Sequence, residues 1–205
     1  MMNPVAAWRK RKSMTQVEAA RELGVSQAYL SLLEHGARPV TEALRGRLRG
    51  GAGERREDRY VAQLSAWGYP GFAHVRRARR RMRVDALLLS VLGEGDVEAR
   101  VAEAMPWLAR RWWGEVDHRW LVRQAKERNL QNRVGFVLAM ANVGGPEWEW
   151  TVGELERARL LAEATLCWDS MPAATRVWMR KNRTALAAHW NILTRMGLED
   201  LGDAG

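Results

Sequence analysis

Apolar residues recur at helical spacing along most of the chain, and this pattern predicts an all-α protein. Positions three and four apart share one face of a helix. The clearest stripes consist of Val97, Val101, Met105 and Leu108; of Leu130, Val134, Val137, Leu138 and Ala141; and of Leu155, Ala158, Leu161, Ala162 and Leu166. A last pair of helices is expected around Val177, Trp178, Leu186, Trp190 and Leu193. No alternating strand pattern occurs, so we predict a bundle or array of about five or six helices from Val84 onward.

Proline and glycine mark the expected ends of these helices. They interrupt the stripes at Pro106, Gly114, Gly144-Gly145-Pro146 and Pro172. Proline has no backbone N–H and breaks the interior of a helix, and glycine favours turns. We therefore expect each of these positions to lie between two helices.

A short helix is predicted to begin after Thr15. Thr15 and Glu18 have the spacing of a capping box, in which each side chain bonds to the backbone N–H of the other residue. The apolar residues Ala19, Ala20 and Leu23 follow, and then Gly24. Because glycine readily adopts the left-handed conformation at a helix end, we place the end of this helix at Gly24.

A second short helix follows almost at once. Ser26 is a good N-cap residue, and we place this helix at about Gln27–Glu34, with Leu30 and Leu33 facing inward. Gly36 ends it. Two short helices joined by so tight a turn must cross steeply, which is the geometry of a helix-turn-helix.

The run from Gln16 to His35 resembles the helix-turn-helix of the phage repressor and Cro class, also called the xenobiotic-response-element class of bacterial regulators. The resemblance covers about Trp8 to Leu48. It rests on Arg9, Gln16, Ala20, Leu23, Gly24, Val25, Leu30, Leu33, Glu34, Gly36 and the pair Arg38-Pro39, which leads to a further helix. It implies an N-terminal domain of about four or five helices that binds double-stranded DNA.

The resemblance also implies roles for single residues. In this class the second helix of the motif lies in the major groove, with its first residues at the base edges. The base-reading positions are then Gln27, Ala28, Ser31 and Leu32. A glutamine amide suits adenine, and the Ala28 methyl group suits a thymine methyl. The alternative to a base-reading role is that Gln27 is a solvent-exposed residue near the start of a helix, with no function in binding.

Contacts to the DNA backbone are implied for a further set. These are Gln16, Ser26, Tyr29, His35 and Arg38. Helix N-termini offer free N–H groups to phosphates, although Tyr29 could equally serve packing. The chain departs from the common pattern at His35, where relatives often have Asn, and at Leu32, where some have a polar base contact.

Positive charge is concentrated in the first part of the chain. Residues 1–83 carry 18 Lys and Arg against 7 Asp and Glu, a net +11, whereas residues 84–205 carry 15 against 17, a net −2. This distribution favours a polyanion-binding module joined to a near-neutral domain. Of the 33 basic residues 29 are Arg, a bias that GC-rich coding can also produce. Anionic lipid would satisfy the charge as well as nucleic acid, although the basic run has only a thin apolar face.

We divide the chain into a helix-turn-helix domain at 1–50, a Gly/Arg-rich linker and basic helix at 51–83, and a Trp-rich helical domain at 84–205. A helix is expected at about Glu54 to Trp67. The densest basic run follows, with Arg76, Arg77, Arg79, Arg80, Arg81 and Arg83. Its arginines, Arg79, Arg80 and Arg81 in particular, either bind DNA phosphates or form a solvated helix face.

The C-terminal domain holds 9 of the 11 tryptophans. They could fill a core or a dimer seam, anchor a protein partner or stack on single-stranded bases. The polar run Asn129–Arg133 could bind a small ligand or a partner, but a solvated or interface face is the plainer interpretation, with Asn129 as an N-cap. Cys167 is expected to be a small buried hydrophobe.

No catalytic constellation, metal-ligand spacing or cofactor loop is found, so we expect no enzyme activity, no metal and no cofactor. No segment has the order of a secretory signal or the about 20 apolar residues of a membrane span. We therefore expect a cytoplasmic, nucleoid-associated transcriptional repressor that binds operator half-sites as a homodimer. The alternative is an antitoxin whose C-terminal domain binds a toxin while its helix-turn-helix autoregulates the operon.

Overall fold

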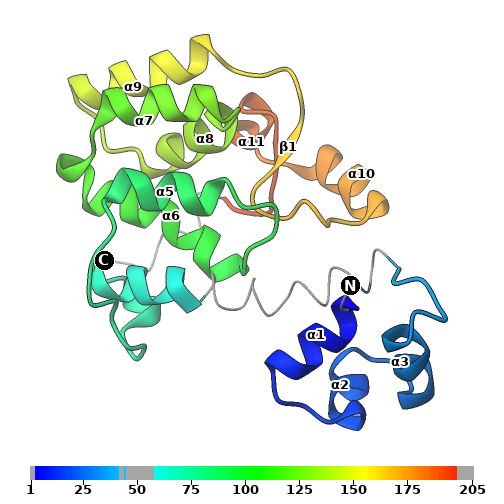
Figure 1. Ribbon diagram of the computed structural model, residues 1–205. Coiled ribbons are helices and arrows are strands. Elements are labelled where there is room, and N and C mark those ends of the chain that lie inside the picture. Colours follow the sequence, from blue (N-terminus) through cyan, green and yellow to red (C-terminus); the bar gives the residue numbers. More distant parts are fainter. Residues whose placement is uncertain (1–2, 42–43, 45–57, 198–205) are drawn as a thin grey trace. The chain divides into compact units, whose positions relative to one another are not determined.

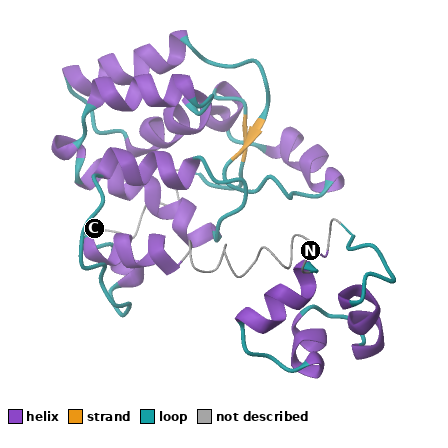
Figure 2. Cartoon of the chain, viewed as in Figure 1, coloured by secondary structure: helices purple, strands orange, loops and turns teal. Residues whose placement is uncertain are grey.

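The computed structural model describes residues 3–41, 44 and 58–197, and the chain divides into two compact units, Met1–Arg56 and Glu57–Gly205 (Figure 1). Each unit has a hydrophobic core of its own. Helices account for nearly all the regular structure of the described residues (Figure 2). The predicted all-α class is confirmed.

Three helices form the described part of the N-terminal unit: α1 (Pro4–Arg11), α2 (Gln16–Glu22) and α3 (Gln27–Glu34). Helix α1 begins where the Asn3 side chain accepts a hydrogen bond from the Val5 N–H at 2.9 Å. Pro4 occupies the first turn, where a missing N–H removes no helical hydrogen bond. The helices enclose a small core of Val5, Trp8, Ala19, Ala20, Leu23, Leu30, Leu33 and Leu44. The further helix expected after Pro39 lies mostly outside the described residues. Gly50, Gly51 and Gly53 of the predicted linker lie wholly outside them.

The C-terminal unit begins with helical residues 58–66. These are followed by η1 (Pro70–Phe72), α5 (Val84–Leu92), α6 (Ala99–Arg111), η2 (Trp113–Glu115), α7 (His118–Glu127), α8 (Gln131–Ala141), α9 (Pro146–Arg157), β1 (Ala164–Thr165), α10 (Ala173–Asn182), α11 (Ala185–His189) and β2 (Ile192–Leu193). From Val84 onward the described residues thus form seven α-helices, slightly more than the five or six expected.

Helix α8 is the centre of this unit and packs against α5, α6, α7, α9 and α11 (Figure 1). Nearly all of its residues are buried, which explains why its sequence is apolar on every side from Val134 to Ala141. At Gly135 the helix meets the ring of Trp190, itself 1% exposed. A Cβ atom at Gly135 would lie only 2.1 Å from that ring, so the close packing of α8 requires glycine here.

Tryptophans surround this core more than they fill it. Trp190 and Trp67 are buried, and four others are partly buried and pack against the core: Trp107, Trp112, Trp113 and Trp120. Trp150, Trp168 and Trp178 are exposed. Of the nine tryptophans in the predicted C-terminal domain, Trp190 lies in the core and the others lie at its edge or on the surface, so the core interpretation is confirmed only in part. A role in a dimer seam stays a prediction.

Two predictions about helix ends were wrong. The stripe that begins at Leu155 does not continue as a helix, because α9 ends at Arg157 and Leu161 is 96% exposed in the loop that follows. Pro106 lies inside α6 rather than between helices. The packing of α6 against α5 and α8 offsets the backbone hydrogen bond that a proline removes.

Two strands also occur where none was expected. Ala164 and Thr165 pair in parallel with Ile192 and Leu193 (Figure 2). Strands of two residues are too short to leave an alternating pattern in the sequence. No helix among the described residues is both long and apolar enough to cross a membrane.

Candidate nucleic-acid interface

The turn between α2 and α3 has the geometry that its sequence predicts. The Thr15 and Glu18 side chains form both halves of the capping box. At the other end of α2, Gly24 adopts a left-handed φ of +62°. The Gly24 N–H then bonds to the Arg21 carbonyl and the Val25 N–H to the Ala20 carbonyl, which is a Schellman ending. The chain therefore leaves α2 in a defined direction and enters α3 two residues later.

Helix α3 begins at Ser26, whose hydroxyl accepts a hydrogen bond from the Tyr29 N–H at 3.2 Å. It ends in a second Schellman motif at Gly36, where φ is +73°. Leu30 and Leu33 are fully buried and fix the inner face of the helix. Both helix ends and the inner face are thus set by local hydrogen bonds and two leucines.

The outer face of α3 carries the side chains predicted to read bases. Gln27 and Ala28 are exposed in the first turn, and Ser31 is half-buried one turn later. Leu32 is 45% exposed, which is unusual for a large apolar side chain on so small a unit. The structure therefore places all four on or near the surface of one short helix, with the pair at its N-terminal end most accessible.

A charged cluster that the sequence did not reveal joins the three helices. The Arg9 guanidinium donates to one Glu34 carboxylate oxygen at 2.6 Å, and the Gln16 amide donates to the other at 2.8 Å. Arg9 also donates to the Met14 carbonyl at 3.1 Å. The hydrogen bond from Arg9 holds the pKa of Glu34 below its usual value. Glu34, which the sequence singled out only through the family resemblance, thus connects α3 to α1 and α2.

The residues expected at the DNA backbone have different surroundings. Ser26, Arg38 and His35 are exposed, whereas Tyr29 is half-buried and packs against the core. Nδ1 of His35 lies 2.8 Å from the Ser31 carbonyl and so carries the hydrogen. In that tautomer Nε2 is an acceptor, so a phosphate contact through Nε2 requires the protonated ring. The Gln16 amide is already held by Glu34, which leaves the second amide hydrogen for a phosphate.

The basic run in the C-terminal unit lies in a loop, so the interpretation as a helix face was wrong. Residues 76–83 follow η1 and contain no helical residue. The loop returns along helical residues 58–66, and the buried Gln63 side chain holds it by donating to the Arg80 carbonyl at 2.9 Å and accepting from the Met82 N–H at 2.8 Å. The Trp67 indole also donates to the Met82 carbonyl at 3.0 Å. These long-range contacts override the helical spacing of the run.

The loop presents its arginines to solvent. Five are exposed, and none of the five forms an ion pair with another described residue: Arg76, Arg77, Arg79, Arg80 and Arg81. Arg81 stacks over the Trp67 ring at 4.4 Å. Arg83 differs, because it pairs with the buried carboxylate of Asp85 and is part of the fold. We refer to residues 76–81 as the arginine loop.

The polar run Asn129–Arg133 forms no open site, and both interpretations given to it were wrong. Asn129 is not an N-cap but has a φ of +56° just after α7, a conformation that Asn tolerates. Gln131 and Asn132 are buried and bond to the Ala158 and Leu160 carbonyls. Arg133 is buried as well and donates to the carbonyls of Leu92 and Glu94, 2.9 and 3.0 Å away. The run ties distant loops to α8.

Residues 5–44 match a protein family model described as Helix-turn-helix. No curated protein and no solved structure shows a significant match to the chain. The matched residues include α1, α2, the turn at Gly24 and α3, which are the elements that carry the sequence resemblance. The N-terminal unit is therefore a helix-turn-helix of the phage repressor and Cro type, a DNA-binding regulator fold.

Proposed function

We propose that the protein is a sequence-specific transcriptional regulator, and a repressor, which reads the major groove with α3. The observation that supports this best is the exposure of Gln27 and Ala28 at the start of a helix whose inner face and both ends are fixed. A rigid helix with free polar side chains at its N-terminal end fits the docking mode of this class. Such a protein acts on the chromosome, in the nucleoid.

Gln27 is the leading base contact in this proposal. Its amide oxygen can accept a hydrogen bond from adenine N6 while its amide nitrogen donates to N7, a bidentate pair that selects adenine. Ala28 and Leu32 present methyl groups that fit a thymine methyl, which accounts for the exposed leucine. Ser31 lies between them and can bond to several bases. The four positions together would read only a few base pairs.

Backbone contacts would fix the register of the helix without reading sequence. Ser26 and the first N–H groups of α3 form one phosphate site, and Gln16 at the start of α2 forms another. In the second unit, the arginine loop would add phosphate contacts that depend strongly on salt. The remaining members of the proposed phosphate-binding set are Tyr29, His35 and Arg38 beside α3, and Arg79, Arg80 and Arg81 in the loop.

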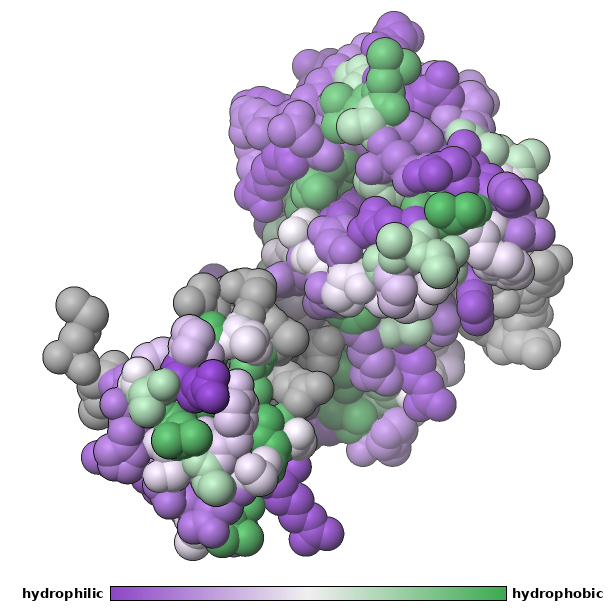
Figure 3. All heavy atoms as spheres, turned by 90° about the vertical axis from the view of Figure 1, so that its right-hand side faces the viewer, coloured by the Kyte–Doolittle hydropathy of each residue, from purple (hydrophilic) through white to green (hydrophobic). Residues whose placement is uncertain are grey.

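Specificity from so short a reading helix requires two copies on paired half-sites, so we propose a homodimer. The C-terminal unit offers surface for the dimer contact. Val177 is 50% and Trp178 53% exposed on α10. In the space-filling view, apolar groups interrupt the polar surface in several places (Figure 3).

The same exposed apolar side chains favour a second candidate function. An antitoxin would use them to bind a toxin, while its helix-turn-helix represses the shared operon. Aromatic side chains are typical anchors of protein interfaces. A small toxin-like reading frame next to the gene, whose product forms a stable complex with this chain, would favour the antitoxin over a self-contained dimer.

Replacing Gln27 by Ala tests the reading role of α3. We expect binding to the selected operator to weaken by about 1–3 kcal/mol, because the two hydrogen bonds to one base can no longer form. Binding to random DNA should remain nearly unchanged, because phosphate contacts carry it. Gln124→Ala, at a half-buried glutamine on α7, is the matched control and should change neither affinity. An equal decrease on operator and random DNA would contradict a base-reading role for Gln27.

A further inference from the structure

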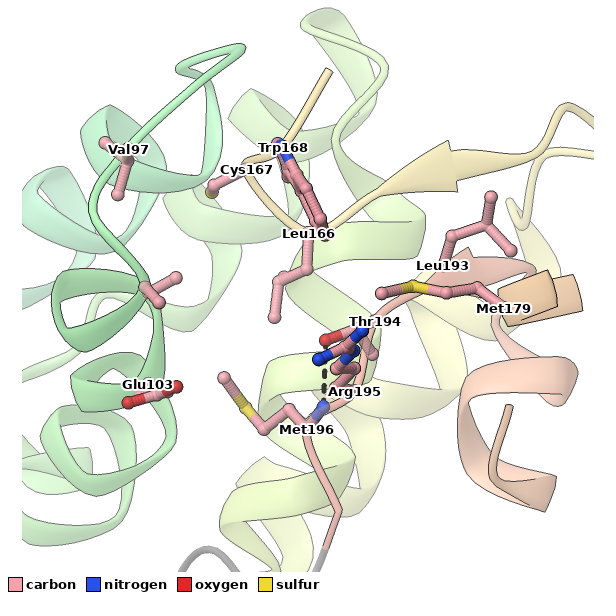
Figure 4. Close-up of a pocket in the computed structure, with 12 residues that line it drawn as sticks. Val97, Glu103, Leu166, Cys167, Trp168, Met179, Leu193, Thr194, Arg195 and Met196 are labelled. Atoms are coloured by element: carbon pink, nitrogen blue, oxygen red, sulfur yellow. Dashed lines mark hydrogen bonds between the residues drawn. The ribbon is translucent and has the colours of Figure 1, made fainter. Parts of the chain in front are cut away.

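A cavity of about 420 Å³ lies within the C-terminal unit, and all of its lining residues belong to that unit. Its volume is in the range of about 300–1,000 Å³ that small-molecule sites occupy. Side chains of Leu166, Trp168 and Met179 point toward its centre from one side, and the start of α6 forms the other (Figure 4). Leu193 of β2 and Met196 in the segment that follows β2 complete the lining, with Met196 at the lower edge of the view (Figure 4). The lining is therefore mostly apolar.

The walls of this cavity are built by long-range contacts. The Val97 N–H donates to the Cys167 carbonyl at 3.0 Å, which joins the segment before α6 to the one after β1. The Leu166 N–H bonds to the Leu193 carbonyl at 3.2 Å and continues the β1–β2 pairing. Since both walls are tied by backbone hydrogen bonds, the cavity is a defined part of the fold and not a gap between loose side chains.

The cavity offers no covalent chemistry. Burial raises the pKa of the Cys167 thiol to about 12, so the thiolate is scarcely present at neutral pH. The Cys167 sulfur also donates to the Val91 carbonyl at 3.4 Å. Cys167 thus acts as an apolar part of the wall, and a ligand would bind without reacting.

Two hydrogen-bond donors lie together at one edge. Arg195 lines the cavity, and its guanidinium lies over the Trp178 ring at 5.6 Å. Within the described part of the chain, Arg195 forms no ion pair. The Thr194 hydroxyl accepts a hydrogen bond from the Met196 N–H at 3.1 Å, which leaves its own hydrogen to donate.

We propose that this cavity binds a small molecule with an apolar body and a single carboxylate. The apolar body would lie among Leu166, Met179 and Leu193, and the carboxylate would accept hydrogen bonds from Arg195 and Thr194. A planar guanidinium matches a carboxylate with two parallel hydrogen bonds. Glu103 on the α6 side disfavours a second negative charge and orients the ligand with its acid toward Arg195. This inference does not depend on the proposed function.

The proposed ligand site can be tested with three probes that share one apolar body: decanoate, decan-1-ol and decylamine. Their binding to the full chain without DNA is measured by isothermal titration calorimetry. We expect decanoate to bind at least about tenfold more tightly than either other probe, since a charge-assisted pair forms only with the acid. Tighter binding of decylamine would make Glu103 the anchor and overturn the proposal. Equal binding of all three, or no binding of decanoate, would overturn it too.

Two variants locate the site. Arg195→Met keeps most of the side-chain length and should weaken decanoate binding about tenfold or more, whereas Arg110→Met, at an exposed arginine of α6 outside the lining, should not change it. Ala99→Phe fills the cavity from an exposed position and should weaken all probes. Circular dichroism establishes that each variant is folded. Unchanged decanoate affinity in either Arg195→Met or Ala99→Phe would place the binding elsewhere and overturn the proposal.

Discussion

The start of α3 and the interior of the C-terminal unit use their polar side chains in opposite ways. In the N-terminal unit the side chains at the start of α3 point to solvent, and the small core contains only apolar residues. In the C-terminal unit Gln63, Gln131 and Asn132 are buried, and each holds a distant loop by hydrogen bonds to backbone groups. The start of α3 thus keeps polar groups free for a partner, whereas the interior of the C-terminal unit uses polar groups to complete the fold.

The stability of the two units therefore depends on different kinds of contacts. Helices of seven or eight residues are marginal in water by themselves, so the N-terminal unit depends on its caps and on the cluster of Arg9, Gln16 and Glu34. The C-terminal unit has a large core but little tolerance around α8, where the neighbours of Gly135 and Asn132 come from remote parts of the chain. Perturbations should therefore act differently on the two.

The largest effect is expected from Gly135→Ala. The new methyl group would overlap the buried Trp190 ring, and overpacking of this kind lowers the free energy of unfolding by about 3 kcal/mol. Gly153→Ala on α9 is the matched control, because its nearest atom would be 3.8 Å away. We expect it to be neutral or stabilising by up to about 1 kcal/mol. Urea denaturation followed by tryptophan fluorescence measures the free energy of unfolding of both variants. If the two substitutions changed this free energy by similar amounts, α8 would not be tightly packed at Gly135.

A smaller effect is expected from the arginine loop. Replacing Arg79, Arg80 and Arg81 by Gln should reduce the slope of log K against log salt by about 0.9 for each phosphate that the variant no longer neutralises. Replacing Arg100, Arg110 and Arg119 removes the same charge from other exposed positions of the C-terminal unit. If both triple variants change the slope equally, only net charge matters and the loop has no specific role.

The loop also shows where sequence reasoning succeeds and where it fails. The capping box at Thr15, the turn at Gly24 and the N-cap Ser26 depend on neighbours within four residues, and all were predicted correctly. The arginine loop depends on Gln63 and Trp67, which lie 17 and 15 residues away from their partners. Local spacing carries no information about such contacts.

The same reason explains the errors in the candidate site regions. The helical spacing from Leu155 to Leu166 is real, but the Asn132 side chain bonds to the Leu160 backbone and directs that segment into a loop. The cluster around Glu34 joins residues 25 apart, and Arg9 was singled out only through the family resemblance. The helix α3 that exposes Gln27 and Ala28 could be predicted from local sequence, whereas their role in base reading stays a prediction.

The smallest effect is expected from pH. Hydrogen bonds from Lys126 and then Arg157 lower the pKa of Glu154 to about 2, from an ordinary 4.5. A carboxyl with a lowered folded-state pKa stabilises the fold above about pH 5, and this contribution disappears as pH falls toward 2. Glu154→Gln should therefore flatten the decline of unfolding free energy over that range, measured by urea titration. A decline as steep as in the unmodified chain would show that Glu154 is not held by these partners.

Helix α3 should distinguish one base sequence from another. Genomic fragments retained by the full chain are sequenced, and the most enriched one is labelled and titrated against unlabelled competitors. We predict that the same fragment competes at least about a thousandfold better than a scrambled one of equal length and composition. Equal competition by the scrambled DNA would contradict sequence reading and leave only charge-driven binding.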